Sequence, residues 1–414
     1  MIRLALDFRS LNYSVRTGIN IYYLNVLKIL AEIKEENSLG KTSKFQKIEI
    51  IGFGLDPKVQ LNLEKEFPWM ANFIDESYSL TEFYNLTFLE RKWPFSKSKL
   101  NRLINITSWF FNRINIHTTD NNLQISHIFQ PQIKSVFLPE KANFVVAVHD
   151  FFYLEIPNWT NPFTRPNEVY SLVKNNLSKA DQIWANSIST ANQTASFFPE
   201  TKDKIKLVYP ALSKIDSFDQ NNLKSSSKVL SKLNLVKEQY FVSISGIEPR
   251  KNWVNLLQAW KSLEEKTGWN YKLVLAGRIV DNQYYYDILD LITTLKLANV
   301  VWFLDISEEE KHVVLCNSVS LLYPSLFEGF GFPILEAWQS EVPAIVGNMG
   351  ASMEIGKGGV LPVNPLDCWD IASGIELLTA DEGFRQELIK NGQKRLQEFN
   401  WQEYKNRFEK WIFE

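Results

Sequence analysis

Short apolar runs alternate with longer amphipathic stretches along most of this chain, and this alternation predicts an α/β fold. The apolar runs of strand type in the first half are residues 2–6, 48–53, 126–129, 144–148, 182–186 and 205–208. A helical pattern begins near Gly18, after the first of these runs, and another follows Ser189. Strands that alternate with helices in this way form parallel sheets with helices on both faces.

The alternation starts again after residues 216–231, a polar stretch rich in serine and asparagine that is typical of a linker. The predicted strands beyond it are residues 241–245, 271–276 and 300–304, and the predicted helices are residues 253–264, 284–296 and 308–317. At 414 residues the chain exceeds what one hydrophobic core normally supports, so we expect two doubly wound domains across a cleft. The predicted boundaries are 1–211 for the first domain, 212–235 for the linker, 236–395 for the second domain, and 396–414 for a C-terminal helix that packs back on the first domain.

Composition and charge narrow the classes of function. The formal net charge of −2 gives no overall field that would attract nucleic acid, so no nucleic-acid partner is expected. The two cysteines, Cys316 and Cys368, lack the spacing of metal ligands, which fits a reduced, cytosolic protein. The first residues read as a strand and not as a signal peptide, and no run reaches the ~18 apolar residues of a membrane span. We expect a cytoplasmic protein and leave open a peripheral position on the inner face of the membrane.

One segment of the first half, residues 91–113, combines basic and aromatic residues without an acid. Its basic and aromatic side chains include Arg91, Lys92, Trp93, Phe95, Lys97, Lys99, Arg102, Trp109, Phe110, Phe111 and Arg113. On an amphipathic helix this combination suits an anionic lipid surface. The alternative is an ordinary helix of the first domain, with a basic face in solvent and an aromatic face in the core.

Residues 328–336 (EGFGFPILE) place two carboxylates, Glu328 and Glu336, around a glycine-rich turn. An apolar run precedes the motif, and Pro333 suits the first position of the helix that follows. Glu328 is therefore predicted in a strand-to-helix loop, and Glu336 in about the first turn of the helix. Such loops form the ligand crevice of open parallel sheets, and two acids there suggest a ligand rich in hydroxyl groups. The simpler alternative is a surface loop whose acids cap a helix.

A second loop of this kind follows the strand at residues 241–245 and reads GIEPRKN, residues 246–252. It is predicted to present Arg250 and Lys251 at a helix N-terminus, where free N–H groups also favour an anion. Two cations in that setting are typical of a pyrophosphate site. The loop is not a Walker loop, because the glycine spacing and the Ser/Thr after the lysine are absent.

One histidine stands apart from the others. His149 follows a predicted strand (FVVAV), which places it at a carboxyl end of the first sheet with Asp150 beside it. A satisfied structural histidine is the alternative. His117, His127 and His312 are scattered, and we expect core or surface roles for them.

The order and spacing of these motifs resemble retaining GT-B glycosyltransferases of family 4, especially the mannosyltransferase-like members. The resemblance covers nearly the whole chain. Besides the two loops, it is carried by Gly18, Pro157 and residues 148–151 (VHDF), 180–187 (ADQIWANS), 204–210 (KIKLVYP), 275–277 (LAG), 323–325 (YPS) and 363–365 (VNP). The implied fold is α/β of the GT-B type, with an N-terminal acceptor-binding domain and a C-terminal domain that binds the nucleotide sugar.

The resemblance also implies a role for each candidate residue. Arg250 and Lys251 would neutralise the donor diphosphate, and Glu336 would bind the nucleotide ribose. Glu328 would hold the donor hexose together with the residues after it, which are Gly329, Phe330 and Gly331.

The remaining implied contacts come mostly from the first domain. His149 would face the sugar, and Asp150 is a candidate contact to the acceptor. Gly18 and Gly246 would be further donor contacts, and Gly18 would let its loop approach the diphosphate without a side chain in the way.

By the same resemblance, no metal and no cofactor is expected, since the loop cations would stabilise the leaving diphosphate and no DxD pair occurs. Retention without an evident protein nucleophile implies front-face attack, with a phosphate oxygen taking the acceptor proton. The chain departs from the family pattern at Ser245-Gly246, at Asp305 and at Glu341-Val342-Pro343. None of these departures removes a proposed catalytic group, but Asp305 stands where relatives usually have glycine.

We thus predict a hexosyltransferase that uses a nucleotide-diphosphate sugar, with GDP-mannose favoured. Its acceptor would be a glycan or lipid-linked glycan in surface polysaccharide biosynthesis. The alternatives are a non-catalytic nucleotide-sugar-binding partner of another transferase, and a GT-B sugar-nucleotide epimerase. A phosphorylase would need a lysine placed for a pyridoxal Schiff base, and no context singles one out. A Rossmann oxidoreductase is disfavoured because no GxGxxG follows the first strand.

Overall fold

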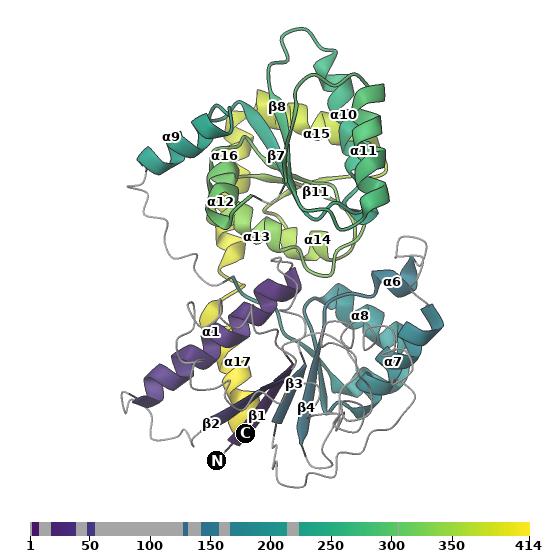
Figure 1. The fold of residues 1–414 in the computed structure, drawn as a ribbon, viewed down its shortest axis with the longest axis vertical. Coiled ribbons are helices and arrows are strands. Elements are labelled where there is room, and N and C mark those ends of the chain that lie inside the picture. Colours follow the sequence, from purple (N-terminus) through teal and green to yellow (C-terminus); the bar gives the residue numbers. More distant parts are fainter. Residues whose placement is uncertain are drawn as a thin grey trace, which may run out of the picture.

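The computed structural model describes residues 2–7, 18–38, 48–53, 127–130, 142–156, 166–212, 223–304 and 306–414. In this part of the chain, two sheets of six strands each form two halves, one above the other in Figure 1. Every strand pair in both sheets is parallel. The predicted α/β class with two Rossmann-like domains is confirmed.

The first sheet has the order β2-β1-β3-β4-β5-β6. Its strands are β1 (Ile2–Asp7), β2 (Ile48–Phe53), β3 (His127–Gln130), β4 (Asn143–Val148), β5 (Gln182–Ala185) and β6 (Ile205–Leu207). The second sheet has the order β12-β11-β10-β7-β8-β9. Its strands are β7 (Tyr240–Ile244), β8 (Lys272–Gly277), β9 (Val300–Leu304), β10 (Leu321–Tyr323), β11 (Ala344–Gly347) and β12 (Leu361–Val363). Successive strands are added toward one edge of each sheet and then toward the other edge. This change occurs between β1 and β3 and between β7 and β10, and open α/β sheets bind ligands at such points.

Helices cover both faces of the first sheet. Alternate strand residues point to opposite sides of the sheet, and apolar residues point to both sides. Val145 and Ala147 of β4 belong to the core that α1 (Gly18–Ser38) covers, whereas Phe144 and Val146 belong to the core under α7 (Pro166–Lys179). The other helices between β4 and β6 in the described part of this half are α6 (Phe152–Glu155), α8 (Ile188–Phe197) and the 3-10 helix η5 (Pro199–Lys204).

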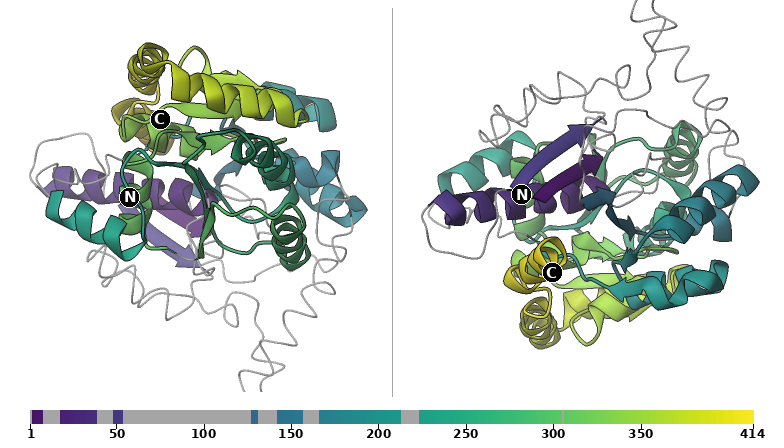
Figure 2. Two further views of the ribbon diagram at one scale, coloured as in Figure 1. Left: turned by 90° about the horizontal axis from the view of Figure 1, so that it is seen from above. Right: turned by 90° about the horizontal axis from the view of Figure 1, so that it is seen from below.

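The second half repeats this construction, and Figure 2 shows both halves end-on. Val242 of β7 lies in one core and Phe241 in the other. The helices are α9 (Leu223–Lys232), η6 (Pro249–Lys251, 3-10), α10 (Trp253–Glu264), α11 (Asn282–Thr294), α12 (Glu308–Cys316), α13 (Phe332–Gln339), α14 (Gly350–Gly356), α15 (Cys368–Ala380) and α16 (Glu382–Leu396). No helix among the described residues has the length and hydrophobicity needed to cross a membrane.

The last helix, α17 (Trp401–Phe413), leaves the second half and lies beside α1 in the first (Figure 1). Phe408 and Trp411 pack with Phe129 in the core of the first half. The buried Lys405 Nζ lies 3.0 Å from a carboxylate oxygen of Glu32 and 2.7 Å from one of Glu36, both on α1. The chain therefore connects the two halves twice.

Most predicted elements match the structure to within a few residues, and α10 has the predicted bounds. The segment predicted as a linker contains a helix, α9, because Leu230 is buried in the second core. The helix of the EGFGFPILE motif begins at Phe332, so Pro333 is its second residue and Glu336 lies in its second turn. The predictions for residues 91–113, Pro157 and Asp305 fall outside the described residues.

Candidate functional site

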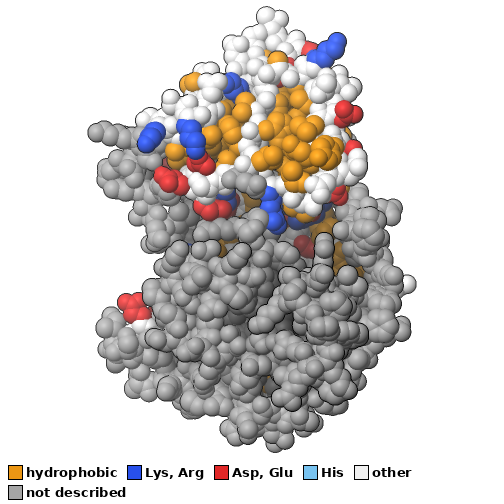
Figure 3. Space-filling view, in the orientation of Figure 1, with side chains coloured by type: hydrophobic (Ala, Val, Ile, Leu, Met, Phe, Trp, Pro, Cys, Tyr) orange, Lys and Arg blue, Asp and Glu red, His pale blue; other side chains and the backbone are white. Residues whose placement is uncertain are grey.

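A cavity of about 810 Å³ lies between the two halves and is lined by residues of both. Its floor is formed by loops that leave the carboxyl ends of β4, β7, β8 and β10, the position expected for a ligand in such sheets. Figure 3 shows basic and acidic side chains of the second half where it meets the first. His149, Asp150 and all the candidate residues of the second half line this cavity. Gly18 is the first residue of α1.

The loop with the two cations is fixed by an asparagine. Arg250 and Lys251 lie on the 3-10 turn η6, directly ahead of the N-terminus of α10, where the loop was predicted to present them. Asn252 separates the two helices and has a left-handed backbone with φ of 61°, which asparagine tolerates better than most residues. Its amide group donates hydrogen bonds to the carbonyl oxygens of Pro324 (3.0 Å) and Pro365 (2.6 Å).

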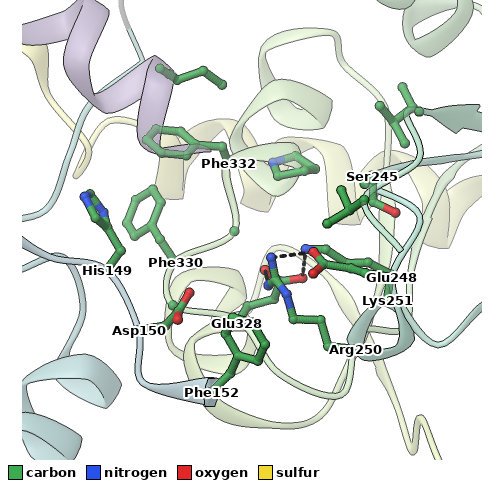
Figure 4. Close-up of a pocket in the computed structure, with 18 of the residues that line it drawn as sticks. His149, Asp150, Phe152, Ser245, Glu248, Arg250, Lys251, Glu328, Phe330 and Phe332 are labelled. Atoms are coloured by element: carbon green, nitrogen blue, oxygen red, sulfur yellow. Dashed lines mark hydrogen bonds and ion pairs between the residues drawn. The ribbon is translucent and has the colours of Figure 1, made fainter. Parts of the chain in front are cut away.

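Glu328 joins the two cations in one buried cluster (Figure 4). One carboxylate oxygen lies 2.6 Å from Lys251 Nζ, and the other lies 3.1 Å from an Arg250 guanidinium nitrogen. Glu328 and Lys251 are each only 7% exposed. Burial by itself would raise the pKa of Glu328, but the two cations outweigh it and lower this pKa to about 2. Burial, and then the charge of Arg250, lowers the pKa of Lys251.

Arg250 has further partners on both sides of the cleft. Its guanidinium group lies 2.7 Å from a carboxylate oxygen of Glu248 and stands 5.2 Å from the centre of the Phe152 ring, which belongs to the first half. Burial opposes its charge, but Glu328 and Glu248 raise the pKa of Arg250 above its ordinary value. Arg250 Nε and Ser245 Oγ are buried with no hydrogen-bond partner among the described residues, so both fit a ligand with oxygen atoms.

Asp150 brings a third carboxylate toward Arg250, from the first half (Figure 4). Burial raises the pKa of Asp150, Arg250 counteracts part of this rise, and Glu328 adds to it. Asp150 therefore binds a proton more readily than an exposed aspartate, whereas Glu328 binds one less readily than an exposed glutamate.

Glu336 also lines the cavity and forms a separate ion pair. Its carboxylate lies 2.8 Å from Lys311 Nζ on α12, and Lys311 also lies 3.3 Å from Glu308. Burial would lower the pKa of Lys311, but Glu336 and Glu308 raise it above its ordinary value. Lys311 and Glu308 were not predicted from the sequence, because only the packing of α12 beside α13 brings Lys311 to Glu336. Glu248, which precedes Pro249 in the cation loop, is the missed residue that the sequence could have indicated.

His149 lies where the two halves touch. Its ring meets the Tyr22 ring edge-on, with the centroids 4.9 Å apart. A β-carbon on Gly329 would lie 1.8 Å from the carbonyl oxygen of His149, so only glycine fits there. Gly331 has φ of 115° and precedes α13, a backbone that also favours glycine. Phe330, between them, is buried against Phe332 and faces His149 in Figure 4.

Similarity to known proteins supports an enzyme of the glycosyltransferase class. Residues 227–395 match the family described as Glycosyl transferases group 1. The chain is 25% identical over 268 residues to O-antigen chain mannosyltransferase B of Escherichia coli, which covers 64% of this chain and 69% of that protein. It is also 25% identical over 233 residues to O-antigen chain mannosyltransferase RfbU of Salmonella typhimurium, which covers 56% of this chain and 59% of the relative. The family match and these relatives together support a hexosyltransferase.

A solved structure shares the fold over nearly the full length. HepE of Anabaena, determined in complex with UDP-glucose, superimposes with a TM-score of 0.65 and 14% sequence identity, and the match covers 99% of each chain. At this identity the likeness establishes the fold, which is of the GT-B type.

Proposed function

We propose that this chain is a retaining hexosyltransferase that moves a hexose from a nucleotide-diphosphate sugar, with GDP-mannose favoured, to a glycan or lipid-linked glycan. The reaction would serve surface polysaccharide biosynthesis, which the similarity to the two O-antigen chain mannosyltransferases supports. The observation that carries this proposal is the buried cluster of Lys251, Arg250 and Glu328, which opens into a cavity shared by both halves.

The cluster suits the leaving group of such a reaction. When the bond between C1 of the sugar and the phosphate breaks, negative charge collects on the diphosphate. Lys251 and Arg250 are held in place by Glu328 before the donor arrives, so they stabilise this charge without reorganising. Arg250 Nε, unpartnered among the described residues, adds one more donor in the same place.

We assign most donor contacts to the second half, and we assign the acceptor side, with His149 and Gly18 as further donor contacts, to the first. Glu336 binds the ribose hydroxyls, and Glu328 with Gly329, Phe330 and Gly331 surrounds the hexose. His149 approaches the sugar from the first half, and Asp150 lies toward the acceptor. Gly246 and Gly18 flank the diphosphate from the two sides.

We further propose that the transfer needs no metal ion and no covalent intermediate on Glu328. Both of its carboxylate oxygens are engaged by cations and its pKa is about 2, which makes it a weak base and a poor nucleophile. Front-face attack, with the leaving phosphate oxygen accepting the acceptor's proton, fits this arrangement. The protein is proposed to act in the cytoplasm, and membrane contact through residues 91–113 remains a prediction outside the described residues.

A ligand screen followed by product analysis tests the proposal. A thermal-shift comparison of GDP-, UDP- and dTDP-hexoses should single out one donor. At a hundredfold excess over its Kd, that donor should stabilise the fold by about 2.7 kcal/mol. With acceptor glycan, NMR of the product should show the anomeric configuration of the donor, in buffer containing EDTA. Inversion would overturn the retaining assignment, and donor binding without transfer to any glycan would favour the non-catalytic binding partner.

A further inference from the structure

The N-terminus of α8, in the first half, is capped by a carboxylate from the second half. The backbone N–H groups of Ile188 and Ser189 donate to the two oxygens of Glu354, at 2.7 and 2.9 Å. Ser187 is the N-cap residue and accepts from the N–H of Thr190. The first N–H groups of a helix have no partner within the helix, so Glu354 completes their hydrogen bonding across the boundary between the halves.

Glu354 is itself held in position by both halves. Tyr209 follows β6 in the first half, and its hydroxyl group donates to a carboxylate oxygen of Glu354 at 2.7 Å. The Arg395 guanidinium donates to the backbone carbonyl of Glu354 at 3.0 Å and to that of Ile355 at 3.3 Å. A carboxylate with three donors, two of them at the positive end of a helix, is in a favourable electrostatic setting.

Thr190 connects the same helix end to both sides of the cavity. Its hydroxyl lies 3.1 Å from the carbonyl oxygen of His149 and 3.2 Å from that of Gly329. Asn186, just before the helix, donates to the same His149 carbonyl at 3.1 Å. Thr190 is fully buried. The loop that carries His149 and the loop that carries Glu328 therefore meet at a single side chain in the first turn of α8.

We propose that Glu354 and Thr190 are positioning residues that hold the two halves closed and keep the His149 loop against the donor loop. The contact is polar and small, which permits it to open and re-form between turnovers. The effect on transfer rests on the proposed function, whereas the closure itself does not. The proposed donor contacts from Gly246 to Glu336 all belong to the second half. Opening of the cleft therefore moves His149 away from the donor and admits water, while these contacts stay in place.

The test compares Glu354→Gln and Thr190→Val with a matched control, Glu376→Gln. Glu376 also lies on a helix of the second half, but its side chain pairs with Lys266 of that same half. We expect kcat to fall about 10- to 100-fold in the two test variants, as for the loss of one or two buried hydrogen bonds. The donor KM should change by less than about threefold, and the ratio of donor hydrolysis to transfer should rise.

Small-angle X-ray scattering provides a readout that does not depend on catalysis. The radius of gyration of Glu354→Gln should exceed that of the wild type, with unchanged circular dichroism, and Glu376→Gln should match the wild type. If Glu354→Gln and the control have the same radius of gyration, Glu354 does not hold the two halves closed. This measurement needs no substrate. An equal loss of donor affinity and kcat in Glu354→Gln would also contradict the proposal. That result would mean that Glu354 only stabilises the second half and does not hold the two halves together.

Discussion

The two sides of the cleft contribute different kinds of groups. The second half presents charges that are paired within that half, with Lys251 and Arg250 on Glu328 and Lys311 on Glu336. The first half presents His149 and Asp150 from the end of one strand, and its contact with the second half runs largely through backbone groups. The family match at residues 227–395 also lies wholly in the second half.

This difference indicates a division of labour. Ion pairs built within one half keep their geometry when the halves separate, so the donor site does not need closure in order to form. His149 has no such independence, since its position over the cavity depends on the contact with Gly329. Substitutions in the two ion-pair clusters of the second half should therefore weaken donor binding, and substitutions of His149 in the first half should slow transfer.

The largest effect is expected for Lys251→Ala. Removing the ammonium group takes away one of the two charges proposed for the diphosphate, so donor affinity should fall by about 100-fold. Titration calorimetry with the donor measures this loss. Lys261→Ala, on the outer part of α10 beside Glu265, is the control and should bind as the wild type does. If Lys251→Ala binds the donor with normal affinity, the charge cluster is not part of the donor site.

A smaller but more selective effect is expected for Glu336→Gln. If Glu336 binds the ribose, affinity for GDP alone and for GDP-mannose should fall together, by about tenfold. Glu328→Gln should instead weaken the sugar nucleotide more than free GDP, because its proposed partner is the hexose. Parallel titrations with the two ligands separate these roles, and identical profiles for the two variants would contradict the assignment.

The sequence predicts well what depends on local pattern. The bounds of α10 follow from the buried stripe of Trp253, Leu256, Leu257 and Trp260, and both ligand loops follow from their positions between a strand and a helix. Local pattern does not encode which loops meet. Glu354 lies 166 residues from Ile188, and this contact depends on the packing of two domains. The pair of Lys311 and Glu336 depends in the same way on the neighbouring places of α12 and α13.

His149→Phe tests whether a residue of the first half affects the rate of transfer and not the affinity for the donor. Phenylalanine keeps a ring to pack against Tyr22 and removes the nitrogen atoms, so donor affinity should stay within about twofold while kcat falls by about tenfold. Tyr22→Phe is the control, since it keeps the ring that His149 contacts. Equal losses in donor affinity and kcat for His149→Phe would contradict the assignment of donor binding to the second half and of transfer to the first.

The smallest effect concerns the pH dependence of stability. The pKa of Glu328 is lowered in the folded protein from 4.5 to about 2. A group with a lowered folded pKa contributes stability that is present above its unfolded pKa and is lost as the pH falls through its folded pKa. The difference in unfolding free energy between wild type and Glu328→Gln should therefore shrink as the pH is lowered from about 4.5 toward about 2. Urea titrations across this range measure it, with Glu376→Gln as the surface control. A difference that stays constant over the range would mean that Lys251 and Arg250 do not hold the Glu328 carboxylate ionised, and the charge cluster could not then be preformed for a diphosphate.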